Sequence, residues 1–496
     1  MLRFPNVTAL GMFVAQSSRF MQLTAQAQDE ARVAERFQIA GFKPADGAEM
    51  RATLLHLSPP TVSFEVFGAD AALQLSEVLS NFKITAGAEV IYDGKVVVIS
   101  AANTGSTTVY TGSLAAPLTG LNVLGKADLR KTMPAAYQNF LHRWQDNYRI
   151  LPEFKMAVAD AEGFLTELRL WLDQLDLALA SLPPTVREAK EREILESLPA
   201  RPALDSLLER FELAAAAVPE AAAETHRLYC RRMLHPLFMC SPFMHRIYTK
   251  PLGYAGDFEM IDMIIRNRLE GKSLFAKLLH KFILDTPPAI SVRNRAVYFT
   301  NKFMAEGTRV VQAGRKPKFF SLGCGPAREV QDFLVQQPLS DQAQFTLLDF
   351  NAETLAHTGR RLEEIRRANG RRATIKTIQK SVYLLLKETT KSVTENEKHD
   401  MIYCSGLYDY LNDRVCKQLN TYLYNFLNPG GVLIVTNFDP VNPIRNIMEY
   451  IYEWFLIHRD AAGMAAMAPE QAARDDWRVV AEPTGCNVFL EARKPL

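Results

Sequence analysis

One stretch decides the fold of the C-terminal part of this chain: Phe319-Phe320-Ser321-Leu322-Gly323-Cys324-Gly325-Pro326-Ala327-Arg328-Glu329. An apolar run that ends in Gly-x-Gly and continues into polar residues predicts a strand, a tight turn and the start of a helix. Glycines let the backbone approach a ligand closely, and the free N–H groups at a helix start favour polar or anionic groups. A Gly-x-Gly element can also be only a tight turn, so its meaning depends on the strands that follow.

An acid stands at the end of the next apolar run, Phe345–Leu348, and is followed by Phe350 and Asn351. This acid, Asp349, is placed to accept hydrogen bonds from ribose hydroxyls, as acids at the carboxyl end of a second strand do in dinucleotide folds. It could instead cap the helix that we expect to begin at Ala352. The sequence leaves both interpretations open.

Further strands are expected after these two, with helical segments between them. The five predicted strands cover 318–322, 345–348, 373–378, 401–404 and 432–436. Such alternation is typical of a parallel sheet covered by helices on both faces. We therefore predict a doubly wound, Rossmann-like α/β domain over residues 301–496. A nicotinamide-binding site is disfavoured, because the position of the third glycine in Gly-x-Gly-x-x-Gly holds Arg328.

This order of elements resembles the class I S-adenosylmethionine-dependent methyltransferases over Lys318–Leu496. The resemblance implies that the cofactor is S-adenosylmethionine and that an antiparallel hairpin, 477–480 with 487–492, closes the sheet. The cofactor-binding residues that it implies are Ser321, Gly323, Cys324, Gly325, Asp349, Phe350, Asn351, Ser381, Val382, Cys404 and Ser405. The chain departs from the family in having Ser321 where an acid is usual and Ala327 where a third glycine is common.

A helical region is expected before this domain, over residues 126–300, because Leu, Ala, Glu and Arg recur at helical spacing from about residue 126 to residue 246. Pro183-Pro184 and the stretch 199–202 mark turns between its helices. The region also contains the block Gly253-Tyr254-Ala255-Gly256-Asp257. This block resembles bacterial methyltransferases for biosynthesis of the 3-hydroxypalmitic acid methyl ester signal, which implies a role in quorum sensing. The alternative is a structural turn, with Asp257 capping a helix over 258–268.

The methyl acceptor determines which side chains would act. A carboxylate acceptor is ionised near neutral pH and needs only a cationic or hydrogen-bonding clamp. The candidates for that clamp are Arg293, Arg295, His235 and Tyr254. An amine or hydroxyl acceptor would need a general base, for which Asp409 and Tyr408 are placed after the fourth strand. The two arginines could instead form structural ion pairs.

From about residue 49 to residue 111 the sequence alternates apolar and polar residues in short runs, which predicts a small antiparallel β-barrel within a domain of residues 1–125. Asp93-Gly94 predicts a hairpin between strands at 88–92 and 95–99. The region loosely resembles PilZ domains, which bind cyclic di-GMP. Arg32 and Arg36 have the spacing of the first ligand-binding element, but His56 and Thr61 replace the acid and the glycine of the second. We therefore expect a degenerate PilZ-like barrel.

Composition excludes several classes of protein. With 57 Lys+Arg and 55 Asp+Glu the net charge is +2, so no nucleic-acid partner is expected. The uncharged run at 4–18 contains polar residues and is too short to span a membrane. The six cysteines form no Cys-x-x-Cys pair, which favours reduced thiols, a cytoplasmic location and no metal site.

Two hypotheses follow. The first is a methyltransferase that O-methylates a carboxylate of a small or fatty-acid-like (acyl) substrate, with the helical region covering the site. The second is a cofactor-binding signalling or scaffold protein, in which the barrel contacts a protein partner or senses a nucleotide. The joint presence of Gly323, Gly325 and Asp349 favours the enzyme.

Overall fold

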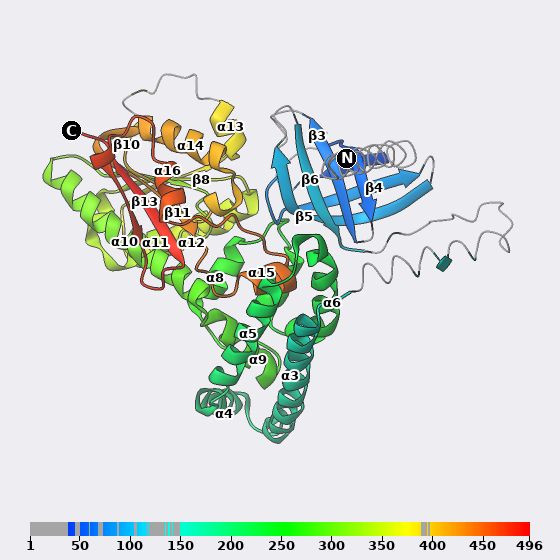
Figure 1. The fold of residues 1–496 in the computed structure, drawn as a ribbon. Coiled ribbons are helices and arrows are strands. Elements are labelled where there is room, and N and C mark those ends of the chain that lie inside the picture. Colours follow the sequence, from blue (N-terminus) through cyan, green and yellow to red (C-terminus); the bar gives the residue numbers. More distant parts are fainter. Residues whose placement is uncertain are drawn as a thin grey trace, which may run out of the picture. The chain divides into compact units, whose positions relative to one another are not determined.

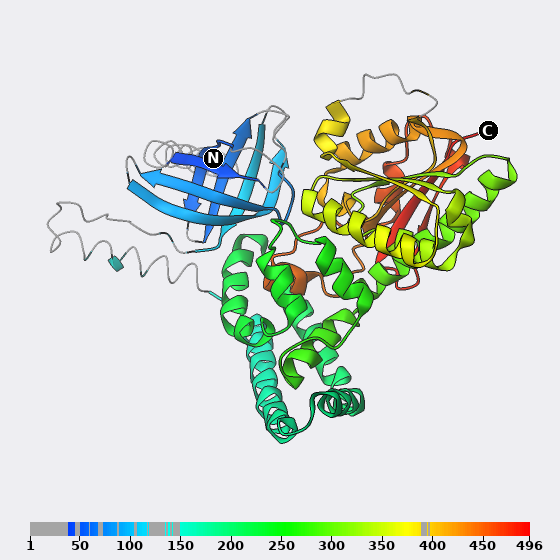
Figure 2. The same ribbon diagram turned by 180° about the vertical axis from the view of Figure 1, so that it is seen from behind.

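The computed structural model describes residues 38–44, 50–58, 60–67, 73–86, 89–103, 107–116, 118, 134, 137–138, 141, 149–387, 394 and 397–496. The chain divides into two compact units, residues 1–133 and 134–496. The second unit contains both the helical region and the C-terminal sheet (Figure 1, Figure 2). The boundary expected at residues 300–301 falls within helix α10 (Pro287–Gln312). The division into three domains therefore stays a prediction.

The N-terminal unit is a six-stranded antiparallel sheet that curves into a half-barrel (Figure 1). Its strands follow the order β1-β4-β5-β6-β3-β2. The strands are β1 (Gln38–Lys43), β2 (Thr53–Ser58), β3 (Thr61–Phe67), β4 (Val78–Ala86), β5 (Glu89–Asn103) and β6 (Thr107–Leu114). Phe42, Phe64, Phe82 and Tyr110 form its aromatic core, with neighbouring ring centroids 5.3–5.8 Å apart. The PilZ likeness stays a prediction, and Arg32 and Arg36 lie outside the described residues.

The hairpin predicted at Asp93-Gly94 is wrong, because β5 runs without a break from Glu89 to Asn103. Gly94 is not part of a turn, but its lack of a side chain makes room for Tyr92. A Cβ atom at Gly94 would lie 2.9 Å from the Tyr92 hydroxyl oxygen. That hydroxyl donates to the Lys95 carbonyl at 2.5 Å and accepts from the Ala115 N–H at 3.2 Å. The tight hairpin joins β4 to β5 instead.

The second unit begins with a set of helices whose breaks lie where the prolines predict them. Pro184 and Pro202 stand in the first turn of their helices, where a missing N–H costs no intrahelical bond, and Pro219 is the N-cap of the next helix. The helices are α3 (Pro152–Leu179), α4 (Pro184–Ser197), α5 (Arg201–Ala216), α6 (Glu220–Phe238), α7 (Pro242–Thr249), α8 (Phe258–Arg266), α9 (Leu274–Leu284) and α10. No described helix is long and apolar enough to cross a membrane.

A seven-stranded mixed sheet follows, in the order β12-β13-β11-β10-β7-β8-β9. Strands β7 to β11 are parallel, and β12 and β13 form the predicted antiparallel hairpin at one edge. The strands are β7 (Lys318–Leu322), β8 (Gln344–Asp349), β9 (Thr374–Gln379), β10 (His399–Cys404), β11 (Leu427–Phe438), β12 (Trp477–Ala481) and β13 (Asn487–Arg493). The later helices are α11 (Arg328–Gln336), α12 (Ala352–Ala368), α13 (Val382–Lys387), α14 (Asp413–Asn425), α15 (Arg445–Tyr452) and α16 (Ala461–Ala466).

The central strands are apolar on both faces, as expected for strands covered on both sides. Along β10, Met401 and Tyr403 belong to one core cluster, with residues of α10, α11 and α12, and Ile402 and Cys404 belong to another, with residues of α14 and α16. This alternation follows the two-residue period of a strand. Helix α10 therefore connects the helical region to one face of the sheet.

We expect Phe303→Ala to lower the free energy of unfolding of the second unit by about 3–5 kcal/mol, because the substitution leaves a cavity in a packed core. Phe303 is fully buried, and its ring lies 5.0–5.6 Å from those of Phe319, Phe333, Phe345 and Tyr403. Urea unfolding followed by tryptophan fluorescence measures the change, since all four tryptophans lie beyond residue 133.

The control is Val297→Ala on the same helix, where the side chain is 59% exposed. It should change the free energy of unfolding by less than about 0.5 kcal/mol. Equal effects of the two substitutions would contradict the described packing of α10.

Candidate functional site

The loop between β7 and α11 combines three residues with positive φ: Gly323 at 66°, Gly325 at 50° and Ala327 at 49°. Glycine adopts this conformation freely, whereas an alanine there costs about 1–2 kcal/mol. The position where a third glycine was expected thus has the backbone that a glycine would favour. A Cβ atom added at Gly325 would meet no atom within 4 Å, so open space lies over this part of the loop.

Asp349 connects this loop to the loop after β8. Its Oδ2 accepts the Gly325 N–H at 3.1 Å, and its Oδ1 accepts the Asn351 N–H at 3.0 Å. Burial raises the pKa of the carboxyl, and the backbone donors act in the opposite direction. Asn351, not Asp349, caps α12, because its Oδ1 accepts from Thr354 N–H at 2.9 Å. The Phe350 N–H is a third backbone donor to this carboxylate, whose two oxygens offer about four acceptor positions, so at least one remains for a ligand.

The remaining cofactor-site candidates follow the carboxyl ends of neighbouring parallel strands, at the same end of the sheet as the loops after β7 and β8. The Lys380 N–H donates to the Asp349 carbonyl at 3.0 Å, which brings Ser381 and Val382 beside the loop after β8. Ser381 precedes α13, and its hydroxyl accepts from Leu384 N–H at 3.4 Å. Ser405 begins the loop after β10, and the side chain of Leu407 in that loop lies within 3.4 Å of a Cβ position at Gly323.

Two cysteines and a serine of the predicted set are buried. Burial raises the thiol pKa of both Cys324 and Cys404, so neither thiol is activated as a nucleophile. Ser321 is buried in β7 beside Tyr403 of β10, with which it forms a side-chain hydrogen bond. These three side chains line the sheet beneath the loops.

Tyr254 lies beside the loop after β8. Its hydroxyl is 3.2 Å from Thr354 Oγ1, and its ring centroid is 5.1 Å from that of Phe350. Burial, with a smaller effect of the Asp349 carboxylate, raises the pKa of this hydroxyl. The tyrosine therefore stays protonated near neutral pH and can donate a hydrogen bond.

The block around Tyr254 is a turn that contacts the loop after β10. Gly253 and Gly256 have φ of 87° and 80°. Asp257 caps α8, which ends at Arg266 and not at residue 268, and its carboxylate pairs with Arg246 at 2.9 Å. Tyr410 donates to the Ala255 carbonyl at 3.2 Å, which fixes the block against the sheet. The structural interpretation of these glycines and of Asp257 thus agrees with the geometry.

Three predicted catalytic residues have structural partners instead. His235 Nε2 donates to the Ile451 carbonyl at 2.8 Å, and burial lowers its pKa to about 4. Arg293 donates to the carbonyls of Ile264 and Leu284, at the ends of α8 and α9. The Tyr408 hydroxyl is fully buried and donates to Asn420 Oδ1 at 2.7 Å. We assign these three side chains to the packing of the protein.

The sequence analysis missed a buried acid at this site. Glu329 in the first turn of α11 is buried, accepts from the Tyr403 hydroxyl at 2.7 Å, and has its pKa raised by burial. Tyr403 is the strand partner of Ser321, so Glu329 brings a carboxyl group from helix α11 to this part of the sheet. Its position in the first turn of a helix after a glycine loop was a signal, but only the fold shows that it points inward.

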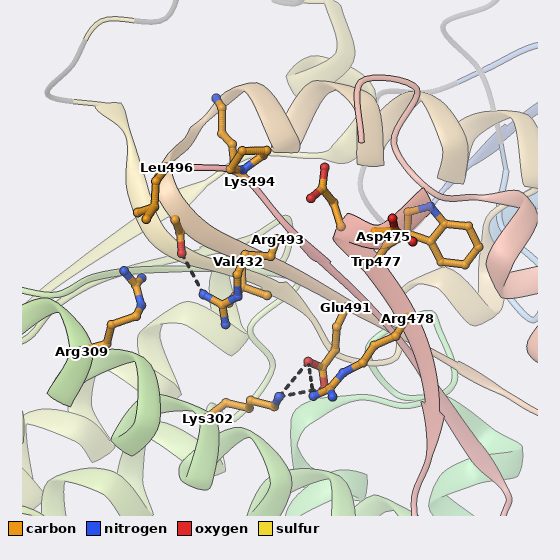
Figure 3. Close-up of a pocket in the computed structure, with 13 residues that line it drawn as sticks. Lys302, Arg309, Val432, Asp475, Trp477, Arg478, Glu491, Arg493, Lys494 and Leu496 are labelled. Atoms are coloured by element: carbon orange, nitrogen blue, oxygen red, sulfur yellow. Dashed lines mark hydrogen bonds and ion pairs between the residues drawn. The ribbon is translucent and has the colours of Figure 1, made fainter. Parts of the chain in front are cut away.

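A separate groove of about 600 Å³ lies at the other end of the strands, where β11 begins and β13 ends (Figure 3). Three of its charged residues pair with one another: Glu491 contacts Lys302 at 2.8 Å and Arg478 at 3.1 Å. Arg493 donates to the Gly430 carbonyl at 2.8 Å. This groove is outside the site formed by the loops after β7, β8 and β10. Within the described ranges, no group of three His, Cys, Asp or Glu side chains is placed to hold a metal ion.

Residues 245–478 match one family model, Methyltransf_20, which is described as "Putative methyltransferase". The matched segment contains the Tyr254 block and all three loops, so this part of the chain carries the sequence pattern of a methyltransferase family. No curated protein matches the chain in sequence.

Three solved structures illustrate the structural matches. A possible exported protein from Bordetella parapertussis is 16% identical, with a TM-score of 0.42, over 64% of this chain and 100% of that one. The N-methyltransferase NodS from Bradyrhizobium japonicum, in complex with S-adenosylhomocysteine, is 12% identical with a TM-score of 0.28, over 43% of this chain and 90% of that one. Magnesium protoporphyrin IX methyltransferase from Synechocystis, with the same ligand bound, is 11% identical with a TM-score of 0.29, over 41% and 86%.

The buried Asp409 predicts a pH dependence of stability. Its Oδ1 accepts the Phe438 N–H at 2.7 Å, and burial raises its pKa to about 7 against the opposing effects of that N–H, Arg295 and Arg459. Because the unfolded value is about 3.9, the folded state binds more protons between about pH 4 and pH 7. The free energy of unfolding should therefore fall as the pH rises through this window.

Asp409→Asn should flatten this pH dependence, because the amide cannot ionise and its oxygen can still accept from Phe438. Thermal unfolding midpoints from pH 4 to pH 8 measure the change. The control is Asp439→Asn, which alters a carboxylate that accepts from the Val441 N–H at 2.9 Å and should follow the wild-type profile. Identical profiles for Asp409→Asn and the wild type would contradict the described burial.

Proposed function

We propose that the second unit is an S-adenosylmethionine-dependent methyltransferase. The observation that carries the proposal is the Asp349 carboxylate, which joins the Gly325 loop to the Asn351 loop beside open space. This arrangement lies inside the segment that matches the methyltransferase family model. Together, the acid, the glycine loop and the family match favour a cofactor site in an enzyme. They disfavour the alternative that the glycine element is only a tight turn.

The residues present fit this cofactor. Open space over Gly325 leaves room for the methionine portion, with Gly323 and Cys324 beside it. The acceptor position that the backbone donors leave on Asp349 would serve a ribose hydroxyl, with Phe350 and Asn351 next to it. Ser381 and Val382 would flank the adenine, and Ser405 would face the cofactor from the loop after β10. Bound S-adenosylmethionine supplies an electrophilic methyl group for an in-line displacement.

The acceptor that we propose is a carboxylate of a small or fatty-acid-like molecule. A carboxylate is ionised near neutral pH, so the chain needs to orient it and exclude water rather than remove a proton. Tyr254 can donate a hydrogen bond at the site.

The roles of the N-terminal barrel and the cellular location are separate proposals. We propose that the barrel is a PilZ-like module that contacts a protein partner and that the enzyme acts in the cytoplasm, as the composition suggests. No observation among the described residues favours the scaffold hypothesis over the enzyme. A small-molecule acceptor remains the expected partner of the second unit.

Calorimetric titration with S-adenosylmethionine tests the proposed function. We expect the wild type to bind and Asp349→Ala to bind about tenfold more weakly, a change of about 1.4 kcal/mol, because the variant loses the ribose acceptor and one support of the Gly325 loop. Circular dichroism and thermal unfolding establish that the variant is folded.

The matched control is Glu353→Ala, which removes an exposed carboxylate from the first turn of α12 without touching the two loops. It should bind like the wild type. No detectable binding to the folded wild type would refute the proposed cofactor.

A further inference from the structure

The structure contains a buried arginine whose charge is not matched by a neighbouring acid. Arg295 lies on α10 and is 6% exposed. Its Nη1 donates to Asn487 Oδ1 at 3.5 Å, and no carboxylate of the described residues forms an ion pair with it. A guanidinium carries five donors, so most of them have no acceptor in the described part of the chain.

Burying a charge without a partner costs several kcal/mol unless something compensates it. The acids nearest to Arg295 are Asp409 and Glu329, which act on it only at longer range. Both are already engaged, since Asp409 accepts from Phe438 N–H and Glu329 from the Tyr403 hydroxyl. Burial lowers the pKa of Arg295, but a guanidinium stays charged in proteins. The position is therefore suited to an anion that the protein itself does not supply.

The guanidinium lies against the loop after β10. A Cβ atom at Gly406 would come within 3.1 Å of Nη1 and 3.2 Å of Nη2 of Arg295, and Gly406 has a φ of 95°. The side chain of the next residue, Leu407, lies 3.4 Å from the position that a Cβ atom would take at Gly323. The positive φ favours glycine at position 406, and a larger residue would press on the guanidinium, which lies beside this loop of the proposed cofactor site.

Two side chains hold Arg295 in this position. The Asn487 amide accepts from Arg295 through Oδ1 and donates through Nδ2 to Ser291 Oγ at 2.6 Å. Both residues are fully buried, so the amide cannot turn away into solvent. The guanidinium is thus oriented from behind while its remaining donors are left for a ligand.

We propose that Arg295 binds a carboxylate group at this site. The inference rests on the proposed function, because it places the carboxylate beside the Gly323 and Gly406 loops. Arginine binds carboxylates through parallel N–H donors, which adds both charge and orientation. Two carboxylates could fill the position: that of the methionine portion of the cofactor, and that of the methyl acceptor.

Arg293 provides a matched control on the same helix. Residues two positions apart on a helix point to different sides, and Arg293 donates to the carbonyls of Ile264 and Leu284 instead. Arg293→Gln should lower thermal stability without changing which ligands bind. Arg295→Gln should change ligand binding selectively.

The experiment measures dissociation constants by calorimetry for the full-length wild type, Arg295→Gln, Arg295→Lys and Arg293→Gln. One ligand pair is S-adenosylhomocysteine and 5′-methylthioadenosine, which lacks the amino-acid end and its carboxylate. The second pair is octanoate and octanol. Gly406→Ala, which displaces the guanidinium and keeps its charge, serves as the second variant if Arg295→Gln does not fold.

We expect Arg295→Gln to bind one of the two carboxylate ligands about tenfold or more weakly than the wild type does. The affinity for the counterpart without the carboxylate should not change. Arg295→Lys should have an intermediate affinity. Weaker binding of S-adenosylhomocysteine assigns Arg295 to the carboxylate of the cofactor. Weaker binding of octanoate assigns it to the carboxylate of the methyl acceptor. Equal losses within each pair, or no loss in either, would overturn the proposal. If the wild type binds neither nucleoside, the proposed cofactor fails, and the octanoate pair still decides the role of Arg295.

Discussion

The Asp349 carboxylate is the interaction on which the proposed site depends. The loops that follow parallel strands lie beyond the strand pairing, so further hydrogen bonds hold them together, such as that from the Cys324 N–H to the Leu348 carbonyl at 3.0 Å. Asp349 does so by accepting one N–H from the Gly325 loop and one from its own loop. Because the backbone donors do not use all the acceptor positions of the carboxylate, the same group can hold the loops and bind a ligand.

Helix α10 makes the helical region and the sheet a single unit. Its aromatic side chains Phe299 and Phe303 pack on the sheet, and Arg293 binds the ends of α8 and α9. Arg295 reaches the loop after β10 from the same helix. The position of that charge is therefore fixed by core packing rather than by a mobile loop, which suits a group that has to orient a ligand.

The site combines buried groups whose pKa is raised with an arginine that stays charged. Burial raises the pKa of Asp409, Glu329 and the Tyr254 hydroxyl. Arg295 keeps its charge in the same surroundings. An anionic ligand would reduce the cost of that charge. Methyl transfer to an ionised carboxylate would then need no proton removal by the chain.

The sequence by itself determined the order of strands and helices after residue 317, the proline-defined breaks between the helices, and the edge at which the glycine loop and Asp349 meet. These features depend on local period and on turn residues, which act over a few positions. The sequence could not decide whether Asp349 or Asn351 caps α12. It also could not tell that Arg293 binds backbone carbonyls whereas Arg295 reaches the site. In each pair the two residues are chemically similar and close in sequence, and they differ in what surrounds them in the fold. Asp93-Gly94 shows the same limit, since the Tyr92 ring and not a turn explains the glycine. Only the tertiary structure decided these questions, because burial and partners come from segments far apart in the chain.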